Sequence, residues 1–255
     1  MTALQVKPLT PSIGASIQGV DLSEPIDATT RAAISQAVLD HEVIFIPAQC
    51  VSPDRHIEIA RWWGDVEDSH PFLPALDDKH PEIRVLDSSE GYRANAWHTD
   101  VTFQPAPPMG SVLHMQQLPE TGGDTMWASS GAAYDALSDR MKVMIDGLSA
   151  VHRTSHRKPA VHPVVRTHPD TGRKALFVNE LWTDDIVELP LTEGRAILAM
   201  LYDIQTQPEF TVRWRFSEGD LAIWDNRCTQ HYALADYGDT DRRIHRVTIL
   251  GDVPV

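Results

Sequence analysis

The chain has 255 residues, and its length, composition and charge exclude several classes of protein. Hydrophobic residues make up 42% and charged residues 23%, which is typical of globular proteins and argues against disorder. The net charge of −14 disfavours nucleic acid as a partner, because binding a phosphate backbone needs clustered Lys and Arg. Residues 1–10 lack a signal-peptide pattern and no apolar run approaches the roughly 20 residues of a membrane span, so we expect a cytoplasmic protein without membrane contacts.

Short β-rich runs, bounded by Gly, Pro and Asp, recur along the chain. In chain order they are predicted at residues 15–20, 43–46, 83–86, 111–118, 161–167, 175–178, 210–216, 221–224 and 244–250. This number of short strands is typical of a sandwich or a jelly roll. No repeat, low-complexity stretch or flexible linker divides the chain, so one domain over residues 1–255 is expected.

Three helices are expected to flank the predicted β core. The clearest has Ser52 as N-cap, Pro53 as first helical residue and Gly64 as C-cap. The other two cover residues 28–40 and about 191–205. The fold class predicted from these patterns is mainly β with flanking helices.

The segment 168–173 and the two cysteines are expected to carry no chemistry. The segment has turn residues at the spacing of a hairpin loop, so it should connect two paired strands. Cys50 and Cys228 are too few for a disulfide framework or a site of four thiolates, although a mixed thiolate and imidazole site stays open. We expect both to be buried thiols.

The most informative motif is His98-Thr99-Asp100. Side chains alternate along a strand, so His98 and Asp100 would lie on one face and could reach one metal ion. His231, which follows a turn, a buried strand and a polar loop, could supply a third ligand. Two imidazoles and one carboxylate with open positions are typical of non-haem iron(II) oxygenases. A lone His-x-Asp pair is weak evidence, because the chain has 12 histidines and 36 acidic residues.

Four blocks of the sequence carry a resemblance to a known family. They are His-Thr-Asp at 98–100, Gly-Gly-Asp-Thr-Met-Trp at 122–127, Trp-Asp-Asn-Arg-Cys-Thr-Gln-His at 224–231 and Arg-Arg-Ile-His-Arg at 242–246. In order and spacing the chain resembles the taurine dioxygenase family of iron(II)/2-oxoglutarate oxygenases, from about residue 13 to residue 254. The fold implied is a double-stranded β-helix, or jelly roll.

The resemblance implies roles for residues that bind metal and co-substrate. His98, Asp100 and His231 match the iron(II) ligands and form the catalytic centre. Thr125 and Arg242 match the groups that hold the distal carboxylate of 2-oxoglutarate. A guanidinium suits that task, because it gives a permanently charged, bidentate clamp that Lys does not reproduce.

The resemblance also implies residues that contact a small anionic substrate. Arg246 and His70 match residues at the substrate head group, and Trp182 matches an aromatic pocket wall. Leu73 and Ala94, by contrast, stand where taurine enzymes have Tyr and Asn. A site built to hydrogen-bond an amine discriminates by such polar groups. Taurine is therefore disfavoured, and a more apolar alkylsulfonate or an alkyl sulfate ester is expected.

The implied reaction uses iron(II), O2 and 2-oxoglutarate. The co-substrate is decarboxylated to succinate and CO2 while a substrate carbon is hydroxylated. For a sulfonate or sulfate ester, the product falls apart to an aldehyde and sulfite or sulfate. The same chemistry on a phenoxyalkanoate or another small carboxylate is the alternative.

Two further expectations follow from the family. Relatives usually carry a longer segment over the active site than the nine residues between 152 and 162, so this lid is short or partly missing from the sequence, and we favour the second reading. The family commonly forms dimers or tetramers, so a homodimer or homotetramer is expected.

Two other classes compete with an oxygenase. A zinc hydrolase or isomerase could use the same ligand set, but it would have no need of Arg242 as a dicarboxylate clamp. A β module with a structural ion would normally show a fourth ligand, and none is apparent in the sequence.

Overall fold

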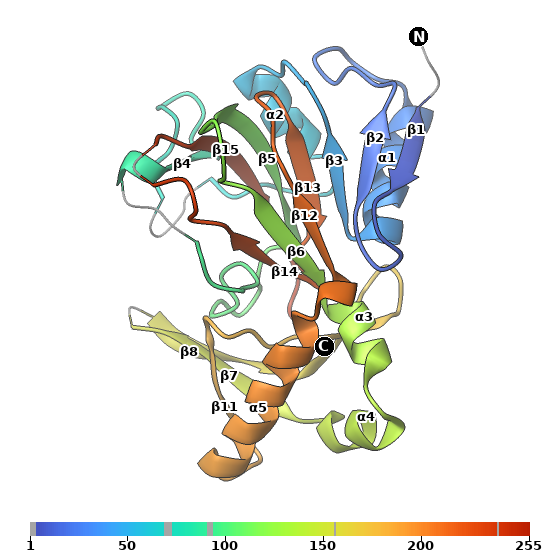
Figure 1. Cartoon of the computed structure of the whole chain (residues 1–255), viewed down its shortest axis with the longest axis vertical. Helices are drawn as coiled ribbons and strands as arrows, with labels where there is room; N and C mark the ends of the chain where they lie inside the picture. Colours follow the sequence, from blue (N-terminus) through green and yellow to red (C-terminus); the bar gives the residue numbers. More distant parts are fainter. Residues whose placement is uncertain (1–3, 69–72, 91–93, 156, 239) are drawn as a thin grey trace.

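The computed structural model describes residues 4–68, 73–90, 94–155, 157–238 and 240–255. A seven-stranded sheet with the order β1-β2-β3-β13-β5-β15-β4 forms its largest layer (Figure 1). Its strands are β1 Gln5–Pro8, β2 Ala15–Gln18, β3 Val43–Ile46, β4 Ile83–Asp87, β5 Gly110–Gln117, β13 Leu221–Asp225 and β15 Arg243–Ile249. The neighbouring pairs are antiparallel except β2 and β3, which are parallel.

A second, three-stranded sheet faces the inner side of the large one. It has the order β12-β6-β14, with β12 Thr211–Trp214, β6 Thr125–Ser129 and β14 Thr229–Ala233. Phe45, Trp127 and Trp224 fill the space between the sheets, and the rings of Phe45 and Trp127 meet edge to face at 5.2 Å. Two largely antiparallel sheets around one aromatic core form the β architecture that the strand count predicted.

Two helices cover the outer side of the large sheet, α1 Ala28–His41 and α2 Pro53–Ala60. Ser52 caps α2 as predicted, because its hydroxyl accepts a hydrogen bond from Arg55 N at 3.2 Å. The predicted end at Gly64 is wrong, since the helix stops at Ala60 and Arg61 is its C-cap. The predictions of helices near 28–40 and 191–205 are confirmed by α1 and α5.

A second group of elements lies below the two sheets in Figure 1. It contains α3 Ser130–Ala136, α4 Asp139–Ile145, α5 Leu191–Gln205 and the sheet β11-β7-β8, with β7 Ser149–Thr154, β8 Arg157–Pro163 and β11 Thr183–Ile186. The predicted run 161–167 is two strands, because Val164 separates β8 from β9 Val165–Thr167. Strand β9 pairs with β10 Lys174–Leu176, so 168–173 is the predicted hairpin loop. Two 3-10 turns, Ser88–Glu90 and Pro208–Phe210, complete the elements.

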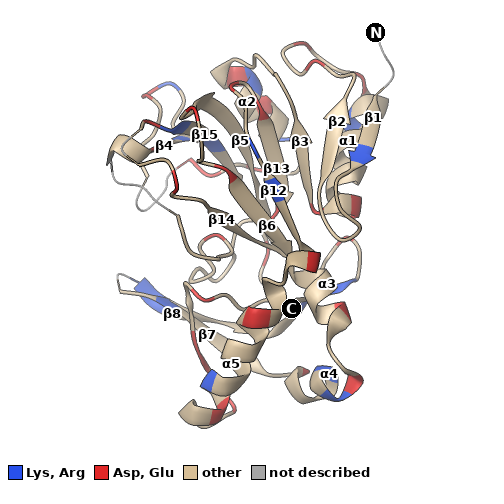
Figure 2. Cartoon of the chain, viewed as in Figure 1, with Lys and Arg blue, Asp and Glu red and all other residues tan. Residues whose placement is uncertain are grey.

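The lid segment of the sequence prediction forms a hairpin. Thr154 of β7 pairs with Arg157 of β8, and the backbone N–H of Arg153 donates to Trp182 O at 2.8 Å. Among the described residues, no helix is long and apolar enough to cross a bilayer. Figure 2 shows acidic residues spread over the ribbon and basic residues on β8.

Candidate active site

Three predicted metal ligands meet in the interior, between the two groups of elements. Nε2 of His98 lies 3.8 Å and Nε2 of His231 lies 3.9 Å from Oδ1 of Asp100. All three side chains are buried, and their ligand atoms lie within 4.8 Å of one another. Such a spacing lets one small ion contact all three at ordinary bond lengths of about 2 Å.

Backbone pairing brings the first and third ligands together. His98 and His231 form an isolated antiparallel bridge, in which His98 N donates to His231 O at 3.1 Å and His231 N donates to His98 O at 2.8 Å. The hydroxyl of Thr99, the next residue, donates to Thr229 O, two residues before His231, at 2.8 Å. The segment of the motif is therefore fixed to β14 along its length.

The hydrogen bond of His98 determines which of its nitrogens can bind a metal. Nδ1 lies 2.8 Å from Ala96 O. A carbonyl oxygen only accepts, so Nδ1 carries the proton and Nε2 keeps its lone pair facing Asp100. Burial, reinforced by the nearby ring of His98, lowers the pKa of His231 to about 3, so this ring is neutral at pH 7. Two imidazoles and a carboxylate fit a divalent iron ion.

Asn226 holds the backbone of the second ligand. Its Oδ1 accepts from Asp100 N at 2.9 Å, and its Nδ2 donates to Asp100 O at 3.3 Å and to Pro108 O at 3.1 Å. The next residue, Val101, has a φ of 42°, which is rare and costly for a β-branched residue. Asn226 offsets that strain by fixing the peptide groups just before it.

A buried arginine contacts the carboxylate of the second ligand. Nη1 of Arg246 lies 3.2 Å from each oxygen of Asp100, and both side chains are more than nine-tenths buried. Arg246 lies on β15, and its side chain also lines the main cavity. Its charge favours an ionised Asp100, which is the form that binds a metal.

The predicted co-substrate residues lie together at one end of the cavity. Arg242 donates through Nε to Gly123 O at 2.8 Å and through Nη2 to Thr125 Oγ1 at 3.1 Å. Gly123 has a φ of 74°, and an added Cβ would lie 3.2 Å from Arg242 Cδ, so a glycine suits this close approach. Arg242 is only 7% exposed, and burial lowers its pKa. Within the described chain it nevertheless forms no ion pair. A buried cation without a carboxylate favours an anionic ligand.

The main cavity has a volume of about 310 Å³ and is lined by two of the three ligands, His98 and Asp100. His98, Asp100, Arg242 and Arg246 line one side of it, with Trp182 among the lining residues as predicted. The remaining wall is largely apolar and includes Leu73, Leu86, Ala94, Leu181 and Ala233. The two residues that depart from the taurine pattern therefore both face the cavity. The predicted substrate residue His70 lies outside the described residues.

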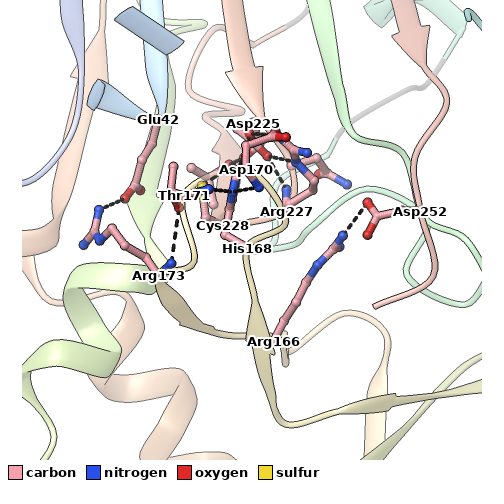
Figure 3. A network of polar contacts seen from close by, with 12 residues as sticks. Glu42, Arg166, His168, Asp170, Thr171, Arg173, Asp225, Arg227, Cys228 and Asp252 are labelled. Atoms are coloured by element: carbon pink, nitrogen blue, oxygen red, sulfur yellow. Dashed lines mark hydrogen bonds and ion pairs between the residues drawn. The ribbon is translucent and has the colours of Figure 1, made fainter. Parts of the chain in front are cut away.

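A second buried cluster, shown in Figure 3, also offers three metal-ligand types. Nδ1 of His168 accepts from the backbone N–H groups of Asp170 and Thr171, both at 3.2 Å. Its proton is therefore on Nε2, which donates to Asp225 Oδ2 at 3.0 Å. This imidazole has no lone pair left for a metal.

The carboxylate of that cluster is already neutralised. Arg227 donates to both oxygens of Asp225, at 2.9 and 2.6 Å, and its Nη2 also lies 2.8 Å from Asp170. Burial would raise the pKa of Asp225, but hydrogen bonds from Arg227 and His168 outweigh burial and hold it at about 2. The cluster of His168, Asp225 and Cys228 is a structural ion-pair network.

Sequence reasoning missed Asn226 and the His168 network, and it misjudged one cysteine. Cys228 is buried as expected, but Cys50 is exposed, because it lies in the loop just before α2. The ring of Trp224, near the end of β13, lies 5.0 Å from that of His231.

Comparison with known proteins identifies the family. The sequence model described as "Taurine catabolism dioxygenase TauD, TfdA family" matches residues 5–248, and the chain belongs to this family. An alpha-ketoglutarate-dependent sulfate ester dioxygenase of Pseudomonas putida is 40% identical over 99% of this chain and 91% of its own length. An alkylsulfatase of Acinetobacter baylyi is 38% identical over 98% of this chain and 86% of its own.

A solved structure extends the similarity to the fold. The crystal structure of a taurine dioxygenase from Burkholderia xenovorans superposes with a TM-score of 0.93 and 38% identity, covering 99% of this chain and 91% of that one. The predicted jelly-roll fold is confirmed. The chain is an oxidoreductase, a 2-oxoglutarate-dependent dioxygenase.

Proposed function

We propose that this dioxygenase binds Fe(II) and hydroxylates a small organosulfur anion, an alkyl sulfate ester or alkylsulfonate, to release an aldehyde with sulfate or sulfite. The observation that carries the proposal is one cavity lined by His98 and Asp100 of the triad and by Arg242, a buried arginine that forms no ion pair within the described part of the chain. The alkylsulfatase and sulfate ester dioxygenase among its relatives support the substrate class.

The residues of the triad would hold the iron, and Arg242 with Thr125 would hold 2-oxoglutarate. Bound iron supplies activation of O2, driven by decarboxylation of 2-oxoglutarate to succinate and CO2. Arg242 fixes the distal carboxylate of the co-substrate with N–H groups that Gly123 and Thr125 leave available. The Thr125 hydroxyl accepts from Arg242, so its own proton is free to be donated to the same carboxylate.

The remaining cavity would hold the substrate. Arg246 places positive charge beside the metal ligands for an anionic head group, and Trp182, Leu86 and Leu181 exclude water around an alkyl chain. Hydroxylation of the carbon that bears the sulfate oxygen gives a product with two oxygens on one carbon. The C–O bond to sulfate then breaks, the hydroxyl proton leaves, and an aldehyde and sulfate result.

The apolar character of Leu73 and Ala94 is the reason to favour an alkyl chain over taurine. Both residues line the cavity, and neither offers a hydrogen bond to an amine. A buried ammonium group without partners would cost several kcal/mol, at least about 2. An alkyl chain incurs no such cost and gains about 0.8 kcal/mol per buried methylene.

We further propose that residues 1–255 form one catalytic domain, in which the hairpin near 152–162 is the lid or the base of a longer one. The hairpin bonds to Trp182 of the cavity wall, which supports this role. The alignment with the Pseudomonas putida relative spans 277 residues, more than this chain has, so that relative carries insertions. We also propose a cytoplasmic homodimer or homotetramer that binds no nucleic acid and no membrane, which light scattering on the purified protein tests for the oligomer.

The function is tested by assaying the enzyme with Fe(II), ascorbate, O2 and 2-oxoglutarate. We expect succinate and an equal amount of sulfate or sulfite from hexyl sulfate or hexanesulfonate, and far less from taurine. Turnover of phenoxyacetate alone would replace the organosulfur assignment by the carboxylate alternative. Absence of succinate with every substrate, together with no binding of 2-oxoglutarate, would refute the proposal.

A further inference from the structure

Among the described residues, six arginines are buried, and most of them have a carboxylate partner. The paired ones are Arg55 with Glu58, Arg166 with Asp252, Arg227 with Asp225 and Arg246 with Asp100. Within the described chain no ion pair is formed by Arg242 or by Arg84. A ligand has already been proposed for Arg242, and Arg84 shows the same signature.

Arg84 does not itself line the main cavity, but it lies next to Arg246, which does. It is on the edge strand β4, directly opposite Arg246 of β15, so the two side chains leave the sheet on the same face. Leu86, two residues further on the same face of β4, lines the cavity, as does Arg246. Like charges directly opposite each other on two strands destabilise a sheet, so this arrangement requires a compensating anion.

The nearest charges do not supply full compensation. The charge of Arg246 is engaged by Asp100, whose two oxygens it contacts. Glu67, Asp68 and Glu82 are close enough for their charges to raise the pKa of Arg84, but burial is the larger effect and lowers it. None of these carboxylates forms an ion pair with Arg84 among the described residues, so its guanidinium has room for a direct anionic partner.

The guanidinium of Arg84 also lacks hydrogen bonds. It is 5% exposed, and neither its Nε nor its Nη2 has a partner in the part of the chain that the structure describes. Two buried hydroxyls on the same sheet face, Ser111 Oγ and Thr248 Oγ1, likewise have no partner among the described residues, and their residues face each other across β5 and β15. Unmet donors gathered beside two guanidiniums are typical of a site for an oxyanion.

We propose that Arg84 is a second cation for the anionic head group of the substrate, acting beside Arg246 and setting the preference for charged over neutral substrates. This inference rests on the proposed function for the sulfate or sulfonate identity of the head, but it requires only an oxyanion. A tetrahedral sulfate has oxygens enough to meet both guanidiniums, whereas a neutral alcohol has no charge for them. Ordered water in place of the anion is the competing occupant.

A structural arginine and a ligand-binding arginine respond differently to removal. Arg84→Met keeps the length and apolar stem but deletes the charge. A buried cation without partners costs stability, so removing it should leave the midpoint of thermal unfolding unchanged or higher. If Arg84 instead supported the fold, the same change would lower the midpoint.

The test measures binding by calorimetry under argon to the enzyme loaded with Fe(II) and 2-oxoglutarate. The ligands are hexyl sulfate, hexanoate and 1-hexanol, and the proteins are wild type, Arg84→Met and Arg84→Lys. Arg61→Met is the matched control, because Arg61 is an exposed arginine paired with Glu82 just ahead of β4. We expect Arg84→Met to weaken hexyl sulfate by about 10-fold or more, the worth of a hydrogen bond to a charged group. The affinity for 1-hexanol should not change, and Arg84→Lys should recover part of the loss.

Three results would overturn the proposal. The first is an equal affinity of wild type and Arg84→Met for hexyl sulfate, which would mean that water alone occupies the site. The second is an equal loss of affinity for hexyl sulfate and 1-hexanol together with a lower unfolding midpoint, and the third is no binding of either anion by the wild type. The outcome separates this inference from the proposed function. If the anions bind through Arg84 while the active enzyme releases neither sulfate nor sulfite, the organosulfur function fails and the role of Arg84 stands.

Discussion

Two buried clusters in this protein each combine a histidine with an aspartate, and they differ in where the imidazole proton lies. In the first, a backbone carbonyl accepts a hydrogen bond from Nδ1 of His98, so Nε2 faces Asp100 with its lone pair. In the second, backbone N–H groups donate to Nδ1 of His168, so Nε2 faces Asp225 as a donor. Residue type and distance alone do not separate the clusters, whereas the second hydrogen bond of each ring does.

The two clusters also differ in how far the charge of the aspartate is neutralised by its neighbours. Asp225 is saturated by Arg227 and His168, and its network joins the hairpin loop 168–173 to the end of β13. Among the described residues, Asp100 contacts Arg246 and lies within 4 Å of Nε2 of His98 and of His231. A closed network stabilises the fold, and an open one binds an ion.

The largest expected effect separates the two histidines. His231→Ala should abolish iron binding, measured by metal analysis after desalting, and lower turnover by about 1,000-fold or more, since metal-assisted charge stabilisation is worth several kcal/mol. His168→Ala should keep iron and turnover per folded molecule but lower the free energy of unfolding by about 1 to 3 kcal/mol. Loss of iron in His168→Ala would break the distinction.

A second, smaller effect is expected at the co-substrate end. Arg242→Lys should raise the 2-oxoglutarate concentration for half-maximal rate by about 100-fold, because lysine keeps the charge but loses the bidentate geometry. Iron binding should stay intact. Arg243→Lys is the control, since its neighbour Arg243 is half exposed and pairs with Asp87 on the opposite face. An unchanged requirement for 2-oxoglutarate in Arg242→Lys would remove Arg242 as the clamp.

Asn226 should act on the metal through Asp100. Asn226→Ala removes three hydrogen bonds around the strained segment and should weaken iron affinity by about 10-fold, as outer-shell partners commonly do. Gln230→Ala is the control, because Gln230 is equally buried next to His231 but bonds to Val178 O. Competition with a coloured chelator measures both affinities. Equal affinities in the two variants would show that Asn226 serves the fold alone.

The smallest effect on turnover is expected at Glu42, which pairs with Arg173 beside the second cluster. Burial raises its pKa to about 7 from an ordinary 4.5, against a hydrogen bond from Ser129 and the charge of Arg173. The folded state therefore keeps the proton of Glu42 to a higher pH than the unfolded state does. The contribution of this protonation to stability is full below pH 4.5 and is lost as pH rises through 7. From pH 5 to pH 8, the free energy of unfolding measured with urea should fall by about 3 kcal/mol more in wild type than in Glu42→Gln. An equal fall in the free energy of unfolding in both proteins would show that the pKa of Glu42 is not raised.

Local features of this chain were predictable from the sequence, because their causes lie within a few residues. Ser52 and Pro53 mark the start of α2 through their own backbone preferences. His98 and Asp100 share a motif whose spacing alone brings them together. The predicted triad meets in the structure because His231 follows a strand and a turn that return it to the same place.

Buried polar strands were not predictable in the same way. Strand β14 carries His231, yet Thr229 and Gln230 are only 1% exposed and give no apolar alternation. Their burial depends on partners far along the chain, such as Val178 O for Gln230. Strands β1, β6, β7 and β11 were missed as well, and β6 begins with the buried Thr125.

The hairpin loop 168–173 is a second case in which local sequence predicted the structure but not the long-range contacts. Its turn residues predicted the pairing of β9 and β10, but not that His168 would bond to Asp225, 57 residues away. The sequence also offered no sign that Cys50 would be exposed, because exposure there is set by the packing of neighbouring loops.

The turn between β13 and β14 has a consequence for how this enzyme could change over evolution. Five consecutive residues, 225–229, hold the ion-pair network, the backbone of Asp100 and the motif segment through Thr229. Leu73 and Leu181, in contrast, lie on loops that contribute no metal ligand, whereas Ala94 lies on the segment that leads to His98. Substitutions of residues that line the cavity can therefore change the substrate range while the metal ligands stay the same. A new organic anion could be accommodated by changing the cavity wall alone.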